Sequence, residues 1–299
     1  MNFYRQLSPN SQGIFFTILT CFLVSVLVAI VRHMSVNFHT FFIVMMRNIF
    51  GLMFFIPQIL SDYKGIFRTK RIHMHIFRNV NGLISMLVWF YVITLLPLSE
   101  AVSITFIVPI ITTLAAMFFL KEKVTKKTWT AIIIGFIGVM IIIRPGFREF
   151  KFAYLLALFS TFLWSVSNVI VKMMTDTEKP KTIVAYMSLI MLIISIPLAL
   201  PYIKPMTNSD IFWFVVMGVV SNLSHMSMSL AYSKTDLSLL QPFDFTRLIF
   251  TSVIAYFAFG EVVDICVLFG AMVILFGVIA VAPRKKKALI KPEIIAIDS

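Results

Sequence analysis

Charged residues are scarce in this chain of 299 residues, with 13 acidic residues against 26 basic ones. Together they make up 13% of the sequence, whereas the apolar types make up 60% and include 31 phenylalanines. Soluble domains contain about 25% charged and about 45–50% apolar residues. So few polar side chains could not cover this much apolar surface in water, so the composition excludes a soluble domain and indicates a membrane protein.

Cysteine is nearly absent, and the sequence motifs of common enzymes are missing. Cys21 and Cys266 both lie in apolar runs, without the spacing of a disulfide framework or a metal site. The chain has no Gly-x-x-x-x-Gly-Lys-Ser/Thr phosphate loop, no His-Glu-x-x-His pair, no Gly-x-Ser-x-Gly elbow and no clustered carboxylate pair. We therefore expect no catalytic residues, no metal, no cofactor and no ATP-driven step within this chain.

The net charge of +13 does not indicate nucleic-acid binding. The basic residues lie in short loops between apolar runs, and no basic domain or aromatic reading surface accompanies them. In membrane proteins such residues determine orientation. We expect no nucleic acid among the partners, which should be a small-molecule substrate and membrane lipids. A homodimer remains open.

Ten mostly apolar segments follow one another along the chain. A helix needs about 20 such residues to cross a hydrocarbon core of about 30 Å. The first segment is too long for a signal-peptide core of about 7–15 residues, so it is predicted to be a permanent span. The sequence thus predicts an all-α membrane protein with ten transmembrane helices, at residues 13–31, 38–60, 77–97, 99–120, 128–143, 153–174, 183–203, 210–232, 237–259 and 263–282.

Lys and Arg residues are unevenly distributed between the two sides that these spans define. The side that carries the N-terminus holds eighteen of them, and the opposite side holds five. Because cytoplasmic loops are enriched in Lys and Arg, both termini are predicted to be cytoplasmic. An even number of spans agrees with termini on one side.

The two halves of the chain resemble each other when the sequence is shifted by 139 or 140 residues. At 140 residues, Ile30-Val31-Arg32 aligns with Ile170-Val171-Lys172. At 139 residues the aligned pairs are Leu98-Ser99 with Leu237-Ser238, Val124 with Val263, Phe118 with Phe257, Glu122 with Glu261, and Gly138-Val139 with Gly277-Val278. Matches of Glu and Gly at one common shift are less easily explained by chance than matches of Leu or Val, and they predict an internal repeat.

The repeat has a geometric consequence. Each copy holds five spans, so the second copy enters the membrane inverted relative to the first. Inverted repeats are common in secondary transporters, whose site lies near the midplane where the repeats meet. We expect a cytoplasmic N-terminal segment at 1–12, a first five-helix repeat at 13–145, a second at 146–283 and a basic cytoplasmic tail at 284–299.

The residues that carry the repeat also carry a family resemblance. They are Leu96-Pro97-Leu98-Ser99, Pro109, Glu122, Gly135 and Pro145 in the first half, Gln241-Pro242, Glu261, Gly270 and Pro283 in the second, and Arg47 in the second span. Through them the chain resembles EamA-type members of the drug/metabolite transporter superfamily. The resemblance implies a 5+5 inverted repeat and secondary transport across the bacterial inner membrane.

Within that superfamily the chain looks most like the S-adenosylmethionine uptake transporters of intracellular bacteria. The likeness rests on Phe118-Phe119-Leu120-x-Glu122, Gly135-Phe136-Ile137-Gly138 and Arg144-Pro145. It implies S-adenosylmethionine as the first substrate to consider.

Arg47, Asp244 and Arg247 lie deep in predicted spans. A charge at the membrane centre costs roughly 2.5–3.5 kcal/mol on insertion scales, so such residues indicate a functional site. Gln241, Asp244 and Arg247 follow one helix face, either as a polar stripe lining a substrate cavity or with Asp244 and Arg247 as a local ion pair. The three charges sum to +1, which suits a solute with an anionic group. Asp244 is the deep carboxylate open to a cationic group or a proton.

Other charged residues lie near predicted span ends, where long side chains can reach the membrane interface. They are Arg78, Glu100, Glu122, Lys172 and Glu261.

The eighth predicted span has a second polar face. Ser221, Asn222, His225 and Ser229 follow helical spacing. They line the substrate site in one interpretation and form hydrogen bonds between helices in the other. His225 is either a proton-coupling group or a packed side chain.

Aromatic residues and prolines complete the predicted site. Trp89, Tyr91 and Trp164 are candidates to stack a ring or enclose a cation, and the alternative is that they face lipid or core. Pro109 and Pro242 interrupt the fourth and ninth spans, and the freed carbonyls favour helices that line a cavity, with a packing kink as the alternative.

The predicted function is therefore a secondary transporter that moves a small metabolite by alternating access, with S-adenosylmethionine uptake or exchange as the leading hypothesis. An exporter of amino acids, drugs or metabolites with the same fold is the alternative within the class. A membrane-embedded lipid-modifying enzyme and a structural scaffold are the alternatives outside it.

Overall fold

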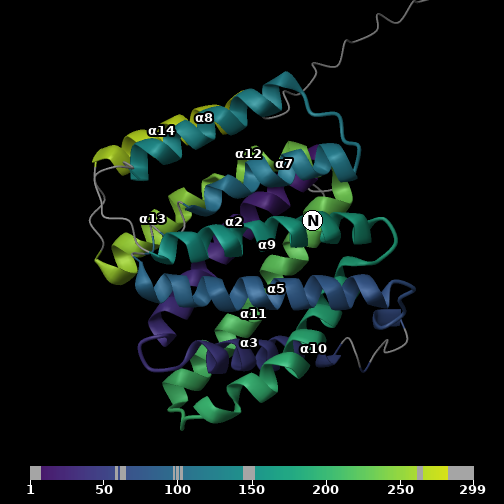
Figure 1. Cartoon of the computed structure of the whole chain (residues 1–299), viewed down its shortest axis with the longest axis vertical. Coiled ribbons are helices and arrows are strands. Elements are labelled where there is room, and N and C mark those ends of the chain that lie inside the picture. The colour runs from purple at the N-terminus through teal and green to yellow at the C-terminus, as the bar shows by residue number, and fades with distance from the viewer. Residues whose placement is uncertain are drawn as a thin grey trace, which may run out of the picture.

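The computed structural model describes residues 8–57, 60, 65–96, 98, 101, 104–143, 152–260 and 265–281. In this part of the chain every regular element is a helix (Figure 1). The helices are α2 (Pro9–Met34), α3 (Thr40–Phe54), α5 (Ile72–Leu95), η1 (Thr105–Ile107), α7 (Val108–Phe119), α8 (Lys126–Ile143), α9 (Phe152–Thr175), α10 (Pro180–Ala199), η2 (Leu200–Tyr202), α11 (Asn208–Lys234), α12 (Leu237–Asp244), α13 (Thr246–Phe259) and α14 (Ile265–Val281).

Several predictions fall outside these residues. The predicted junction of the repeats at 145–146, most of the N-terminal segment and the basic tail all lie there. So do the motif residues Pro97, Ser99, Glu100, Arg144, Pro145, Glu261 and Pro283.

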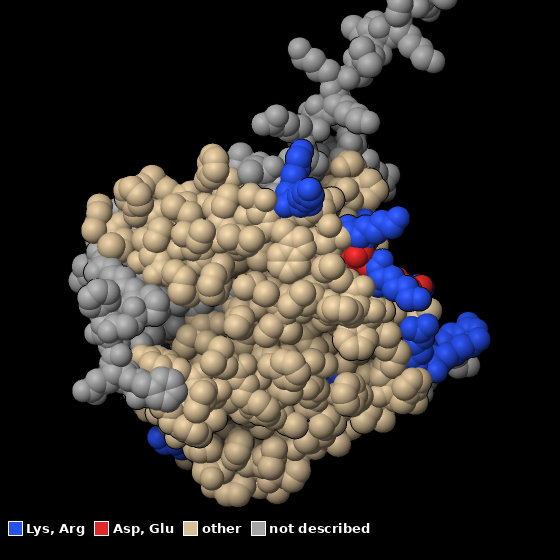
Figure 2. Space-filling view, turned by 45° about the horizontal axis from the view of Figure 1, so that its top comes forward, with Lys and Arg blue, Asp and Glu red and all other residues tan. Residues whose placement is uncertain are grey.

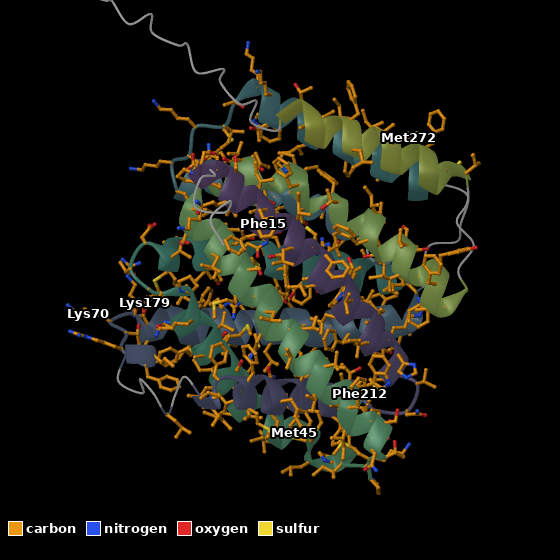
Figure 3. The ribbon with its side chains drawn as sticks, turned by 180° about the vertical axis from the view of Figure 1, so that it is seen from behind. Phe15, Met45, Lys70, Lys179, Phe212 and Met272 are labelled. Carbon is orange, nitrogen blue, oxygen red and sulfur yellow. The ribbon has the colours of Figure 1, made fainter. Side chains whose placement is uncertain are left out.

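Five of the described helices are long and apolar enough to cross a membrane by length and composition: α2, α5, α9, α10 with η2, and α11. α3 and α7 are shorter apolar helices. The space-filling view shows a face almost without charge, and most of the Lys and Arg side chains gather along one edge (Figure 2). Lys70 and Lys179 project from the same end of the bundle (Figure 3).

Local sequence explains where several helices begin and end. α2 starts after Ser8, whose Oγ accepts a hydrogen bond from the Ser11 N–H at 3.2 Å, with Pro9 in the first turn. α11 starts with a capping box between Thr207 and Asp210. α13 ends at Gly260, whose φ of 64° is the left-handed conformation that glycine adopts without strain.

The ninth predicted span is not one continuous helix. The structure divides the predicted span over 237–259 into α12 and α13, which meet at Phe245, in agreement with the interruption expected from Pro242. Pro242 lacks the N–H that would continue the hydrogen-bond ladder of α12. The fourth span is also irregular, since η1 precedes α7 and Pro109 occupies the first turn of α7.

The internal repeat is visible in the burial of the side chains. From residue 21 to residue 57, the pattern of buried, half-buried and exposed positions recurs residue by residue 140 positions later, over 161–197. Helix packing follows the same relation: α2 packs on α11 as its equivalent α9 packs on α5, while α3 packs on its own equivalent α10, and α8 on its own equivalent α14. Paired contacts of this kind are what a two-fold relation between two five-helix units produces.

The helices approach most closely where small residues meet. A Cβ added to Gly218 of α11 would lie 2.7 Å from the backbone N of Gly51 in α3. At the same crossing the Asn222 side-chain N–H donates to the Gly51 carbonyl, and Asn222 Oδ1 accepts from Ser188 of α10 at 3.1 Å. Small residues at helix crossings permit such contacts in membranes.

Candidate functional site

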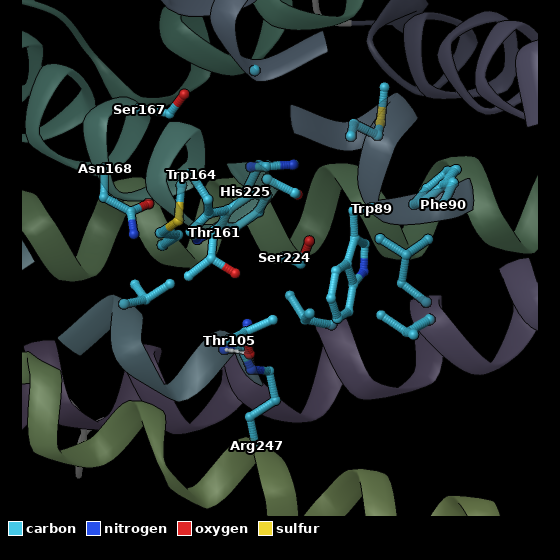
Figure 4. A pocket seen from close by; sticks show the side chains of 18 of the residues that line it. Trp89, Phe90, Thr105, Thr161, Trp164, Ser167, Asn168, Ser224, His225 and Arg247 are labelled. Atoms are coloured by element: carbon cyan, nitrogen blue, oxygen red, sulfur yellow. Dashed lines mark hydrogen bonds between the residues drawn. The ribbon is translucent and has the colours of Figure 1, made fainter. Parts of the chain in front are cut away.

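A buried cavity lies between the two halves of the chain. Its walls come from α2, α3, α5, α7, α9, α10, α11, α13 and η1. The centres of water molecules have about 80 Å³ available in it, which is room for several waters. Figure 4 shows Trp89 and Trp164 on opposite sides, with Arg247 pointing toward Thr105 between them.

The cavity is built from equivalent positions of the two repeats. Trp164 occupies the position of Val24 at a shift of 140, and His225 occupies that of Met86 at a shift of 139. Arg247 likewise occupies the position of Val108, and all six residues line the cavity. The cavity therefore lies on the axis that relates the two repeats. At each of these paired positions, the polar or charged group comes from only one of the two copies.

Arg47 of α3 is buried in the wall of this cavity. Its Nε donates to Ser221 Oγ at 2.6 Å, and its Nη1 lies against the Met86 sulfur. Among the described residues, no carboxylate lies within ion-pair distance of Arg47. The described groups that contact its guanidinium are therefore neutral.

Arg78 of α5 is a second buried arginine in the same wall, and the prediction that it reaches the interface was wrong. Its side chain is 4% exposed, Nη1 donates to Asn79 Oδ1 at 2.7 Å, and Nε has no hydrogen-bond partner in the described part of the chain. The predicted span began at residue 77, whereas α5 begins at Ile72. Because α5 begins earlier, Arg78 lies more than one turn inside the helix. The polar residue next to it, Asn79, was the feature of the sequence that could have indicated a buried polar site.

Asp244 and Arg247 form the ion pair that was one of the two interpretations. Arg247 Nη2 lies 3.1 Å from Asp244 Oδ2 and donates to Thr105 Oγ1 at 2.9 Å. Arg247 lines the central cavity, and Asp244 lines a smaller adjoining cavity together with Gln241. The ion pair thus lies where the two cavities meet, with the Asp244 side chain 25% exposed.

Three further predicted residues line the central cavity: Trp89, Trp164 and His225. The rings of Trp164 and His225 are 6.1 Å apart, and His225 Nδ1 has no hydrogen-bond partner among the described groups. An aromatic ring bound between Trp89 and Trp164 would have apolar faces on both sides.

The structure does not bring the remaining predicted residues to the cavity wall. Tyr91 is 51% exposed, because it follows Trp89 by two positions and therefore lies on the opposite side of α5. Asn222 bonds α3 to α10 at the helix crossing. Pro109 and Pro242 are buried in α7 and α12 but are not among the lining residues of either cavity.

Sequence reasoning missed most of the neutral polar wall. The sequence feature that could have revealed this wall is a run of hydroxyl and amide residues at helical spacing in α9, where lipid-facing positions would be apolar. The missed lining residues are Thr105, Ser160, Thr161, Ser167, Asn168, Ser224 and Thr251. In the described part of the chain, no group of His, Cys, Asp and Glu is arranged to hold a metal ion.

A helical bundle made of two related halves around a central buried cavity is the architecture of a membrane transporter. The sequence pattern of the EamA-like transporter family matches residues 11–144 and 151–282, so this chain belongs to the EamA-like transporter family. The two matches correspond to two copies of the family's repeat.

Characterised relatives differ in what they carry. The chain is 24% identical to an S-adenosylmethionine uptake transporter of Rickettsia felis, over 86% of this chain and 88% of the relative. It is 30% identical to a riboflavin transporter of Brucella anthropi, over 72% and 78%. It is 22% identical to the pseudopaline exporter CntI of Pseudomonas aeruginosa, over 92% and 97%.

A solved crystal structure has the same fold. It superposes with a TM-score of 0.76 at 16% identity and covers 91% of this chain and 96% of its own.

Proposed function

We propose that this protein is a ten-span secondary carrier of the bacterial inner membrane that moves a small metabolite by alternating access. The observation that carries the proposal is the buried cavity lined by equivalent positions of both repeats. Because the two halves share one packing pattern, they can exchange conformations and open the cavity to either side. Relatives named as transporters over most of the chain support the same role.

S-adenosylmethionine uptake or exchange is the first substrate to test. It is what the Rickettsia relative is named for, and Trp89 and Trp164 offer two aromatic faces for a ring such as adenine. Labelled S-adenosylmethionine is supplied to cells that express the chain, with and without excess unlabelled solute and a protonophore. We expect saturable uptake, competed by the unlabelled solute. Loss of uptake with the protonophore would indicate energised import, and persistence would indicate exchange.

The control for this experiment is the same cells without expression of the chain. No saturable uptake by the unaltered chain would remove S-adenosylmethionine as the substrate. Export of an amino acid or metabolite is the second candidate function, favoured by the named exporter among the relatives. Export would then be tested by measuring efflux of the solute from preloaded vesicles.

A further inference from the structure

The described lining of the central cavity contains more positive charge than negative charge. Arg47, Arg78 and Arg247 line it, and the described lining residues include no Asp or Glu. Among the described residues, the adjoining cavity contributes the carboxylate of Asp244, which is already paired with Arg247 at 3.1 Å. Three positive charges and one negative charge leave an excess of two.

Arg47 and Arg78 account for that excess. Both are buried, both line one cavity, and their charges repel each other. Their described partners are a hydroxyl, a thioether sulfur and an amide oxygen. Among described residues, Arg78 Nε has no partner, although a guanidinium offers five donors. Buried charges in proteins are normally paired. Two buried arginines whose described partners are all neutral can therefore bind a negative group that enters the cavity.

We infer that the solute's anionic group, a carboxylate or a phosphate, binds between Arg47 and Arg78, and that of two solutes with the same ring the more negative one binds more tightly. This inference rests on the proposed function only in requiring that the cavity admits a solute. A ring next to the anionic group would lie between Trp89 and Trp164. His225, whose Nδ1 also lacks a described partner, can donate to the same anion.

The inference ranks substrates by charge. S-adenosylmethionine carries a carboxylate, an ammonium and a sulfonium, a net charge of about +1 at neutral pH, and would raise the excess in the cavity. S-adenosylhomocysteine has the same adenine and carboxylate without the sulfonium charge. Riboflavin 5′-phosphate differs from riboflavin by one phosphate. These two pairs vary charge while the ring is kept constant.

The test is equilibrium dialysis of the full-length protein in phosphatidylcholine nanodiscs with each of these four compounds. We expect S-adenosylhomocysteine and riboflavin 5′-phosphate each to bind about tenfold more tightly than its partner compound. Arg47→Gln or Arg78→Gln should abolish the preference. Arg78→Lys should keep it, because the charge remains. Arg71→Gln, at the N-cap of α5 and outside the cavity, should also keep it.

Equal or weaker binding of the more negative compound in both pairs would overturn the inference. So would a preference that survives Arg47→Gln and Arg78→Gln together. A lipid headgroup is the other source of the same chemistry. If the preference disappeared when phosphatidylglycerol was added to the nanodiscs, the lipid would be the occupant and the solute inference would fail.

Uptake distinguishes failure of this inference from failure of the carrier proposal. S-adenosylmethionine uptake that is unchanged by both arginine substitutions would leave the carrier standing and remove the anion site. A charge preference in dialysis without transport of any of the four compounds into proteoliposomes would support the anion site and count against carriage of these solutes.

Discussion

At the scale of single residues, the repeat supplies positions and the two copies fill them differently. Met86 and His225 are equivalent, as are Val108 and Arg247, yet in each pair only the second-half residue is polar. Arg47 reverses this pattern, since its equivalent in the second half is Met187. An exchange of conformations needs similar packing in both halves, but a binding site needs specific groups, so the chemistry of the site breaks the symmetry of the scaffold.

Asn222 shows how a residue can serve packing where a binding role was predicted. Its amide joins the Gly51 carbonyl of α3 to Ser188 of α10. Hydrogen bonds between helices contribute about 0.6 kcal/mol on average in membranes and reach about 1.7 kcal/mol. We expect Asn222→Ala to lower the free energy of unfolding by about 1–2 kcal/mol and to leave the apparent affinity for solute unchanged. Denaturant titration in detergent, together with solute titration, measures both quantities.

The control for this prediction is Asn37→Ala, in the exposed turn after α2. A loss of affinity in Asn222→Ala at unchanged stability would show that the substrate-binding interpretation of Asn222 was right and the packing interpretation wrong.

At the scale of elements, helix ends are completed by side chains from distant parts of the sequence. The Glu122 carboxylate, between α7 and α8, accepts from the N–H groups of Leu237 and Ser238 at 2.9 Å each, at the start of α12. Lys172 Nζ of α9 donates to the carbonyls of Tyr232 and Thr235 at the end of α11, at 2.8 Å each. An anion at a helix N-terminus and a cation at a C-terminus both oppose the helix dipole.

Glu122 is therefore expected to stabilise α12 rather than to bind solute. α12 is short, and its own N-cap residue, Asp236, makes no side-chain capping bond. We expect Glu122→Ala to leave two N–H groups without their acceptor and to destabilise the protein by about 1–2 kcal/mol. Thermal melting in detergent measures this, with Lys123→Ala, an exposed neighbour, as the control. Equal melting temperatures for the two variants would contradict the capping role.

At the scale of the whole molecule, an inverted repeat requires equivalent turns to lie on opposite sides of the membrane. Val36 and Asp176 are 140 residues apart, in the matching turns after α2 and α9, and both are exposed. The distribution of Lys and Arg predicts Val36 outside and Asp176 in the cytoplasm. Direct repeats would instead place the two turns on one side.

Cysteine labelling tests this arrangement. With Cys21 and Cys266 replaced by alanine, we expect a membrane-impermeant maleimide to label Val36→Cys on intact cells. Asp176→Cys should react only after the cells are permeabilised. Labelling of both positions on intact cells, or of neither, would refute the inverted topology. The unlabelled double alanine variant is the control for background reaction.

The sequence alone determined the class of protein, the repeat and most helix positions, because apolar length and similarity at a fixed shift are properties of the linear chain. It also identified Arg47, Asp244 and Arg247, since a charge within an apolar run is costly wherever the helix faces. It did not determine which side of each helix faces the cavity. Tyr91 and Asn222 were therefore grouped with Trp89 and His225, and Arg78 was assigned to the interface.

Only the tertiary structure decided those assignments, for a physical reason particular to membranes. In water, an apolar stripe marks the buried face of a helix. In a membrane, lipid and protein interior both accept apolar side chains, so apolar residues only weakly distinguish the buried face of a helix from its lipid-facing side. The rotation of each helix is set by its contacts, such as Gly218 against Gly51 in α11 and α3. These contacts join residues far apart in the sequence, and they place Arg78 beside Arg47 in one cavity wall.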